Sequence, residues 1–491
     1  MSAASRAYPV LIMGLALICF ALALFVPAVL NDGDTFMHIA AGAWMLDHHQ
    51  VATIDPFSLT FRDHPWVSHE WLSEVAMALA YRIGHWPGFL LLFASAAAAS
   101  VFLLGRAARR WLDPLPAALL VLGAMFTLFR TFLARPHLLV LPIMVLWATI
   151  ILTARSQGRA PPLVAALLMI PWVNLHGSFL VGPAFAAAAA LEAWTQSPGR
   201  RAQVARAWGI FLLATLAATC ATPHGIAGLL LPFHLLAVPA LQNISEWAPV
   251  NFAHQPPIMP LMLGLLYMGL VYSPRLPRLR VALVVILLFQ ALLHARNQLL
   301  FGVFGLLVLA EPLGRYFRGA AAQPPPPARL PAIAWAAWLA LAAAVLVVRV
   351  EMPIHIGDAA TRPVTALAHL PPGLAAQPVL NSYNFGSYLI FRGIRPYIDG
   401  RVELYGNAYV QHYLDMVHPS HALLAATLAQ DHITWTLFSA GSAVADMMDL
   451  MPGWKRIYAD KYAVVLARTD ALGAPTQPLI PAKAGTQIKG R

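Results

Sequence analysis

NDGDTFMHIAAGAWMLDHHQVATIDPFSLTFRDHPWVSHEWLSEVAMALAYRIGHW, residues 31–86, is a polar segment between two hydrophobic runs that are each long enough to cross a bilayer. It holds a large share of the 21 acidic residues of the chain. Carboxylates and imidazoles gathered beside a membrane surface indicate a candidate site. Its titratable candidates are Asp32, Asp34, His38, Asp47, Asp55, Asp63, His69, Glu70 and Glu74.

The composition is that of a polytopic membrane protein. Hydrophobic residues make up 59% of the 491 residues and charged residues only 11%, with a mean hydropathy of +0.66. A soluble protein carries roughly twice that share of charge. The net charge of +11 would suit nucleic-acid binding in a soluble chain. Here the arginines stand in short runs between apolar segments, where they orient a membrane protein, so we expect no nucleic-acid partner.

A transmembrane helix needs about 20 predominantly apolar residues. This measure predicts about eleven spans, several of them short, and an uncleaved first span because the first apolar run is too long for a signal peptide. The predicted spans lie near residues 8–30, 87–105, 114–133, 138–154, 161–175, 178–196, 208–222, 256–273, 281–295, 298–314 and 331–350.

The arginine-rich loops predict the orientation of these spans. Runs such as 106–110 and 275–280 fall on the side opposite to residues 31–86. The positive-inside rule therefore places the N-terminus in the cytoplasm, and an odd number of spans places the residues after about 350 outside.

Three regions are predicted along the chain. Residues 1–350 form a transmembrane domain that includes the first outer loop 31–86, residues 351–470 form a small extracytoplasmic α/β domain, and residues 471–491 form a disordered tail. In the α/β domain, residues 379–406 alternate apolar and polar side chains around glycines, which predicts strands joined by turns. Residues 419–448 are predicted to be helical. Trp454–Thr469 is predicted to be a hairpin, and Asp399-Gly400-Arg401 a turn closed by a salt bridge.

Two helices that lie on the membrane surface are predicted in the first outer loop, over residues 34–49 and 68–81. Asp34 and His38 are four residues apart and share a helix face. A carboxylate at the start of such a helix, with Asp32 two residues earlier, can act as a general base on an acceptor hydroxyl or hold a divalent cation against a phosphate. One of the two carboxylates could instead cap the helix.

His69 and Glu70 add an imidazole and a carboxylate to the same loop. Asp34, His38 and Glu70 are candidate ligands for Mg²⁺ or Mn²⁺, which such groups permit without requiring. Loops predicted on the same side carry more cationic, imidazole and amide side chains, which mark a cavity or extend to the membrane interface. These side chains are Arg135, His137, His176, Arg296 and Asn297.

The order of these features resembles the GT-C superfamily, integral membrane glycosyltransferases that use polyprenyl-phosphate-linked sugars. Asn31-Asp32-Gly33-Asp34-Thr35, followed by His38, is similar to the acidic motif of the family's first outer loop. Ile54–Ser58 and Trp66–Leu72 are similar to a pattern in a bacterial branch of GT-C-like proteins of unassigned function. The resemblance covers nearly the whole chain and implies a bacterial inner-membrane protein with its C-terminal domain on the periplasmic side of the cell envelope.

The resemblance also implies roles for individual residues. Asp34, with Asp32 beside it, would be the catalytic carboxylate that activates an acceptor hydroxyl. Arg135, His137, His176, Arg296 and Asn297 would surround the donor's phosphate, since an anionic leaving group needs cations and donors where charge develops. His38, His69 and Glu70 of the first loop are further candidate substrate-binding residues.

The leading hypothesis is therefore a glycosyltransferase that moves a sugar from a polyprenyl-phosphate donor to a lipid, glycan or protein acceptor outside the cytoplasm. One alternative is a transporter or flippase of a lipid-linked saccharide. Another is a non-catalytic assembly protein with a GT-C-like scaffold. The acidic residues favour the enzyme over the transporter, because a transporter places such residues at mid-membrane, often on broken helices.

Overall fold

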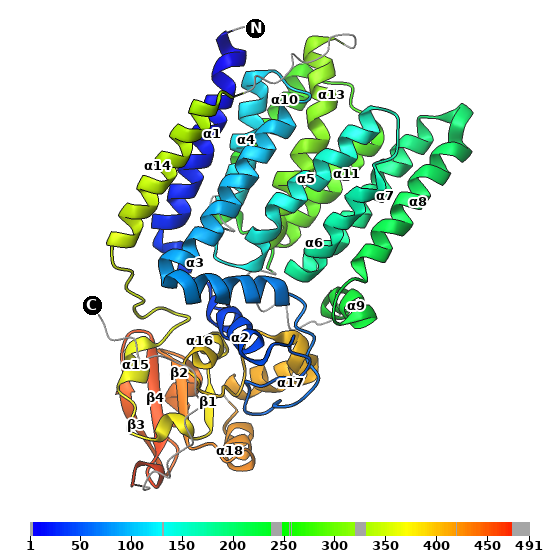
Figure 1. The fold of residues 1–491 in the computed structure, drawn as a ribbon. Coiled ribbons are helices and arrows are strands. Elements are labelled where there is room, and N and C mark those ends of the chain that lie inside the picture. The colour runs from blue at the N-terminus through cyan, green and yellow to red at the C-terminus, as the bar shows by residue number, and fades with distance from the viewer. Residues whose placement is uncertain are drawn as a thin grey trace. The chain divides into compact units, whose positions relative to one another are not determined.

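The computed structural model describes residues 3–129, 132–236, 248–254, 256, 258–319, 330–418 and 420–473 (Figure 1). The chain divides into two compact units. One comprises Met1–Ile54 and Pro65–His355, and the other comprises Asp55–His64 and Ile356–Arg491. The polar segment 31–86 is therefore shared, because its middle residues belong to the C-terminal unit.

The first unit is a helical membrane unit. Seven helical segments among the described residues are long and apolar enough to cross a membrane, and four shorter apolar helices accompany them. The chain is thus a multi-pass membrane protein, and its long helices run roughly alongside one another in Figure 1. The α-helices of this unit are α1 (Ala3–Phe25), α2 (Thr35–His48), α3 (Trp71–Ala108), α4 (Pro114–Phe129), α5 (Pro136–Ser156), α6 (Met169–Leu175), α7 (Val181–Thr195), α8 (Arg201–Thr219), α9 (Gly225–Leu236), α10 (Ile258–Tyr272), α11 (Arg278–Leu293), α12 (Gln298–Leu300), α13 (Leu306–Arg318) and α14 (Ala332–Glu351).

Each of the eleven predicted spans coincides with one of these helices or with a short series of them. The span near 161–175 is a 3₁₀ turn, Leu163–Leu168, followed by α6, and the span near 298–314 is α12, a π-helical turn at Phe301–Gly305 and α13. The helix α9 was not predicted. Its 12 residues rise only about 18 Å, which is short of a hydrocarbon core of roughly 30 Å, and Pro232 interrupts its pattern.

Both helices predicted in the first outer loop are present. The second is the first part of α3, whose backbone leaves the helical conformation at Gly84 and His85. Pro87 follows directly and has no N–H to continue the helical hydrogen bonds, so the chain bends there before entering its span. In Figure 1 the first part of α3 lies across the ends of the long helices.

The close approach of α2 to α3 depends on one glycine. A Cβ atom at Gly42 would lie 1.9 Å from the backbone oxygen of Glu74, so only glycine permits this packing. The contact brings the face of α2 that carries His38 against the face of α3 that carries Glu74.

The C-terminal unit is built on a four-stranded mixed sheet of order β1-β2-β4-β3. Strand β1 is parallel to β2, and the other neighbours are antiparallel. Its core includes Trp435, Leu437 and Val465, all fully buried. The elements are α15 (Val364–Ala368), β1 (Val379–Asn381), α16 (Gly386–Phe391), α17 (Val402–Val417), α18 (His421–Gln430), β2 (Trp435–Ser439), α19 (Ala443–Met448), β3 (Trp454–Ala459) and β4 (Ala463–Arg468).

The predicted hairpin is present as β3 and β4. Its turn is held by Asp460, whose Oδ1 accepts hydrogen bonds of 2.7 Å from the N–H groups of Tyr462 and Ala463. Such a side-chain turn is typical of Asp at this position.

Two other predictions for this unit were wrong. Residues 379–406 form one short strand and then mostly helix, because the aromatic and glycine residues there pack helices α16 and α17 rather than further strands. Residues 419–448 contain β2 between two helices. Four of the five residues of β2 are fully buried, and such a continuous apolar run cannot be told from buried helix by its pattern. Most of the predicted disordered tail, from residue 474 on, lies outside the described residues.

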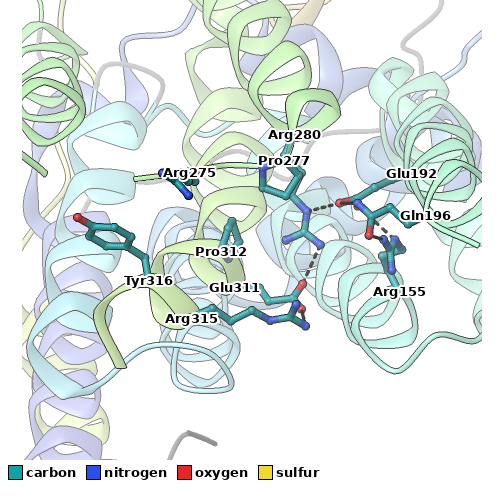
Figure 2. A pocket seen from close by; sticks show the side chains of 10 residues that line it. All are labelled: Arg155, Glu192, Gln196, Arg275, Pro277, Arg280, Glu311, Pro312, Arg315 and Tyr316. Atoms are coloured by element: carbon teal, nitrogen blue, oxygen red, sulfur yellow. Dashed lines mark hydrogen bonds and ion pairs between the residues drawn. The ribbon is translucent and has the colours of Figure 1, made fainter. Parts of the chain in front are cut away.

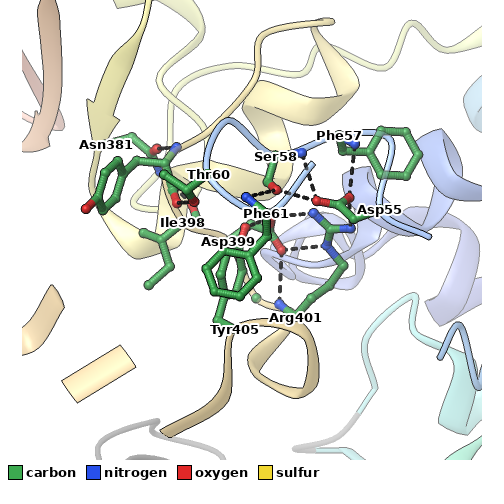
Figure 3. A network of polar contacts seen from close by, with 12 residues as sticks. Asp55, Phe57, Ser58, Thr60, Phe61, Asn381, Ile398, Asp399, Arg401 and Tyr405 are labelled. Carbon is green, nitrogen blue, oxygen red and sulfur yellow. Dashed lines mark hydrogen bonds and ion pairs between the residues drawn. The ribbon is translucent and has the colours of Figure 1, made fainter. Parts of the chain in front are cut away.

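A buried ion-pair network joins residues 55–64 to the rest of the C-terminal unit (Figure 3). Arg401 donates to Asp399 Oδ2 at 2.7 Å and to Asp55 Oδ1 at 2.6 Å, and all three side chains are almost completely inaccessible. The predicted salt bridge of Asp399 with Arg401 is confirmed. Burial alone would raise the pKa of Asp399, but the charge and hydrogen bonds of Arg401 outweigh burial and hold that pKa below its ordinary value.

Replacing Arg401 by methionine should destabilise the C-terminal unit by about 3–5 kcal/mol, because Asp399 and Asp55 would be left buried without their cation. The measurement is denaturant-induced unfolding of the full chain in detergent, with protease cleavage of the C-terminal unit as the readout. Arg395→Gln is the matched control, since Arg395 is exposed. Equal midpoints for R401M and the wild type would contradict the assigned role.

Candidate functional site

The carboxylate of Asp34 forms an ion pair with the guanidinium of Arg135. Asp34 directly precedes α2, and Arg135 directly precedes α5. Thr35 reinforces this approach by donating from Oγ1 to the backbone oxygen of Ala134 at 3.1 Å. The two helix starts are thus held together where a carboxylate and a guanidinium meet.

Asp32 and Asp34 have different roles at the start of α2. Asp32 caps the helix, since its Oδ2 accepts from the N–H of Thr35 at 3.1 Å and also lies 3.4 Å from Nε of Arg135. The side chain of Asp34 does not cap the helix and is 28% exposed, against 4% for Asp32. Asp34 is therefore the more accessible of the two carboxylates.

His38 lies buried between two carboxylates of α3. Its Nδ1 is 3.1 Å from Glu74 Oε1, and its Nε2 is 3.7 Å from Glu70 Oε2. Ser68 donates to the other oxygen of Glu74 at 2.6 Å. Burial alone would lower the pKa of His38, but the hydrogen bond to Glu74 and the charges of Glu70 and Glu74 outweigh burial and raise this pKa to about 9. His38 is therefore a cation at neutral pH.

Glu70 continues this cluster toward His69 and His176. Its Oε1 lies 3.7 Å from Nε2 of His69 and 3.5 Å from Nε2 of His176. The Nδ1 of His176 accepts from the N–H of Ser178 at 3.1 Å, so a neutral His176 carries its proton on Nε2, facing Glu70. Burial and the charge of Arg296 together keep the pKa of His176 well below its ordinary value.

Hydrogen bonds between α3 and α6 position this cluster. Trp71 Nε1 donates to Asn174 Oδ1 at 2.7 Å, and Ser73 Oγ donates to the backbone oxygen of Leu175 at 2.7 Å. Asn174 in turn donates to the backbone oxygen of Ala221 at 2.9 Å. The end of α6, which precedes His176, is thereby fixed beside Glu70.

A cavity of about 680 Å³ opens beside these residues. Its polar lining contains seven of the ten predicted site residues, and sequence reasoning missed three more. The predicted ones are His69, Glu70, Arg135, His137, His176, Arg296 and Asn297, and the missed ones are Ser178, Gln290 and His294.

The cavity changes from polar to apolar along α11. Leu283, Ile286 and Leu287 line it first, and Gln290 and His294 follow on the same helix face. The distance from residue 283 to residue 294 is roughly 16 Å along the helix. Residues of α7 and α9, such as Phe185 and Leu231, add to the apolar part.

The remaining predicted site residues, Asp32, Asp34 and His38, are not among those that line the cavity. Asp34 adjoins it through Arg135, which both lines the cavity and holds Asp34. Glu74, the main partner of His38, was not selected as a site residue. The sequence feature that could have identified Glu74 is its position four residues after Glu70, which places both carboxylates on one face of a helix.

The structure does not bring Asp34, His38 and Glu70 together as a set of metal ligands. Among the described residues no group of three His, Cys, Asp or Glu side chains is arranged to hold a metal ion. Asp34 is paired with Arg135, and the Nδ1 of His38 is paired with Glu74.

The protonation of His38 makes stability depend on pH. Because its pKa is raised in the folded state, its contribution should be complete below about pH 6.5 and be lost as the pH rises through about 9. His38→Gln should remove this loss, which we expect to be on the order of a few kcal/mol. The measurement is thermal unfolding of the full chain between pH 6 and 10.

His48→Gln is the control for this experiment, since His48 lies on the same helix with an exposed side chain. It should keep the wild-type pH dependence. A His38→Gln protein that loses stability over the same pH range as the wild type would show that His38 is not the titrating group.

AglB and ArnT are among the solved membrane proteins that share this fold. The archaeal oligosaccharyltransferase AglB from Archaeoglobus fulgidus, in complex with an inhibitory peptide and a dolichol-phosphate, matches with a TM-score of 0.55 and 9% identity over 89% of this chain and 70% of that chain. ArnT from Cupriavidus metallidurans matches with 15% identity in two states. The structure of ArnT bound to undecaprenyl phosphate matches with a TM-score of 0.50 over 97% of this chain and 100% of that chain. Without a ligand, its TM-score is 0.52 over 96% and 100%.

No protein-family model and no curated protein matches the sequence. AglB and ArnT are both membrane glycosyltransferases of the GT-C superfamily, and the predicted GT-C fold is confirmed. At these identities the likeness extends to the fold, so the roles of individual residues rest on the geometry described above.

Proposed function

We propose that this protein, which has the GT-C fold, is a glycosyltransferase that moves a sugar from a polyprenyl-phosphate-linked donor to a hydroxyl of a lipid, glycan or protein acceptor. The observation that carries this proposal is the cavity with a basic end and an apolar end. A polyprenyl phosphate has the same two parts, an anionic phosphate and a long isoprenoid chain. The dolichol-phosphate and undecaprenyl phosphate in the AglB and ArnT structures support the assignment.

Arg135 and Arg296 would hold the donor's phosphate. Both line the polar part of the cavity, together with His137 and Asn297. When the bond between the anomeric carbon and the phosphate oxygen breaks, negative charge develops on the phosphate. Guanidinium groups stabilise that charge through their fork of N–H donors.

Asp34 would act as the general base. It accepts the proton of the acceptor hydroxyl, whose oxygen attacks the anomeric carbon and forms the new glycosidic bond. The electron pair of the breaking bond stays with the polyprenyl phosphate, which leaves as an anion. Arg135 would orient Asp34 toward the donor's phosphate site. No step of this mechanism is assigned to a divalent cation.

The proposed topology follows the charge distribution of the loops. Arg135, His137 and His176 lie at helix ends on the same side as the first loop, whereas the arginine-rich loops lie at the other ends. We place the arginine-rich side in the cytoplasm of a bacterial cell and the transfer reaction on the extracytoplasmic face of the inner membrane.

Asp34→Asn should lower sugar transfer by about 10²–10⁴-fold, because an amide cannot accept the proton. The assay is transfer of labelled sugar from polyprenyl-phosphate donors by the purified full chain. Asp47→Asn is the matched control, since Asp47 is an exposed carboxylate of the same helix paired with Arg82. It should keep wild-type activity.

The same assay separates the proposal from its alternatives. Undiminished transfer by D34N would remove Asp34 from the mechanism. Movement of a lipid-linked saccharide across liposome membranes without any transfer would indicate a transporter. Donor binding with neither activity would indicate a non-catalytic protein.

A bulky side chain in the apolar part of the cavity should discriminate between donors by chain length. Ala184→Trp on α7 should weaken use of a long-chain donor at least tenfold and leave a donor with a short prenyl chain nearly unaffected, because only the long chain reaches the apolar part. Ala187→Trp is the control on the same helix, at an exposed position outside the cavity lining. Equal effects of the two variants on both donors would contradict this path for the chain.

A further inference from the structure

A second polar cavity, of about 310 Å³, lies at other helix ends of the membrane unit (Figure 2). It is formed by the end of α5, the end of α7, the start of α11 and the middle of α13. Its charged lining consists of Arg155, Glu192, Arg275, Arg280, Glu311 and Arg315.

This cavity is on the membrane face opposite to the proposed glycosyltransferase site. Arg135 directly precedes α5 and Arg155 lies in its last turn, so roughly 30 Å of helix separates them. The helix α11 repeats this arrangement, with Arg280 in its first turn and His294 just after its end. Since this distance is about the thickness of the hydrocarbon core, the two cavities cannot share one ligand headgroup.

Part of the second cavity is a paired and buried network. Figure 2 shows Arg280 between two carboxylates, with Nε 2.9 Å from Glu192 Oε1 and a terminal nitrogen 2.7 Å from Glu311 Oε2. The Nε of Arg155 lies 3.3 Å from the other oxygen of Glu192. These contacts hold α5, α7, α11 and α13 together and account for both carboxylates.

The remaining positive charge is not accounted for by the fold. Four arginines and two glutamates line the cavity, which leaves two positive charges in excess. Arg275 makes no hydrogen bond or ion pair with any described residue. Arg315 pairs with Glu311, yet its side chain is 61% exposed. The start of α11 has no acidic residue in its first turn, and its dipole adds to the positive potential.

We propose that this second cavity binds a phosphate group at the membrane surface, presented by the headgroup of an anionic phospholipid. Arginine's planar fork of donors matches phosphate oxygens, and two of the four guanidinium groups remain accessible to them. The cavity is at the lower end of the size range of small-molecule sites, which suits a headgroup rather than a whole lipid. Phospholipid phosphates lie at the depth of helix ends, where this cavity opens.

The test is thermal unfolding of the full chain in detergent with added phosphatidylglycerol, phosphatidylcholine or inorganic phosphate. Phosphatidylglycerol should raise the Tm of the wild type more than phosphatidylcholine does. The double variant R275Q/R315Q should lose this difference while keeping the Tm of the lipid-free protein close to that of the wild type. R275Q alone, which breaks no described contact, should reduce it.

Arg278→Gln is the matched control, because Arg278 begins α11 but does not line the cavity. It should respond to phosphatidylglycerol like the wild type. A rise in Tm that depends on these arginines and occurs with inorganic phosphate alone would support the phosphate site and show that its ligand is a soluble phosphate. A phosphatidylglycerol shift that persists in R275Q/R315Q, or that R278Q removes equally, would overturn the proposal. Neither result bears on sugar transfer, which is tested at the opposite membrane face.

Discussion

One largely buried arginine between two carboxylates is the interaction on which the structure depends, and the described residues contain it in three places. Arg135 lies between Asp32 and Asp34, Arg280 between Glu192 and Glu311, and Arg401 between Asp399 and Asp55. A charge removed from water costs several kcal/mol unless a partner and hydrogen bonds compensate it. Each arginine therefore fixes segments that are distant in the sequence, at a place where apolar packing alone would not specify their positions.

The three bridges differ in how much of their charged side chains remains exposed. This exposure distinguishes a bridge that only stabilises the fold from one that can contact a ligand. Arg401 and its partners are completely enclosed, so that bridge is structural. Arg280 is enclosed but is bordered by Arg275 and Arg315, whose accessible charge is the basis of the proposed phosphate site. At Arg135 one carboxylate caps a helix and the other remains partly exposed beside a cavity whose lining changes from basic to apolar. That combination is the one that suits a reaction of a lipid phosphate.

Much of the membrane unit could be predicted because its helices are specified by residues that are close together in the sequence. Long apolar runs fix the spans, and Asp34 with His38 four residues on fixes a helix start near the surface. The partners of these residues were not predictable. Glu74 meets His38 because α2 packs on α3, and Asp55 meets Arg401 across 346 positions because residues 55–64 fold into the C-terminal unit. The strand β2 was missed for another reason, since burial on both faces removes the alternation that marks a strand at a surface.

We propose that the cavity beside Arg135 holds a lipid phosphate next to the carboxylate of Asp34. The most direct measurement is an experimental structure of the full chain with a bound polyprenyl phosphate. We expect the phosphate to lie within hydrogen-bonding distance of Arg135 and Arg296, the prenyl chain to run along α11 toward Leu283, and Asp34 to face the open side of the phosphate. A phosphate bound elsewhere, or a cavity filled by the protein's own side chains in the bound state, would contradict it.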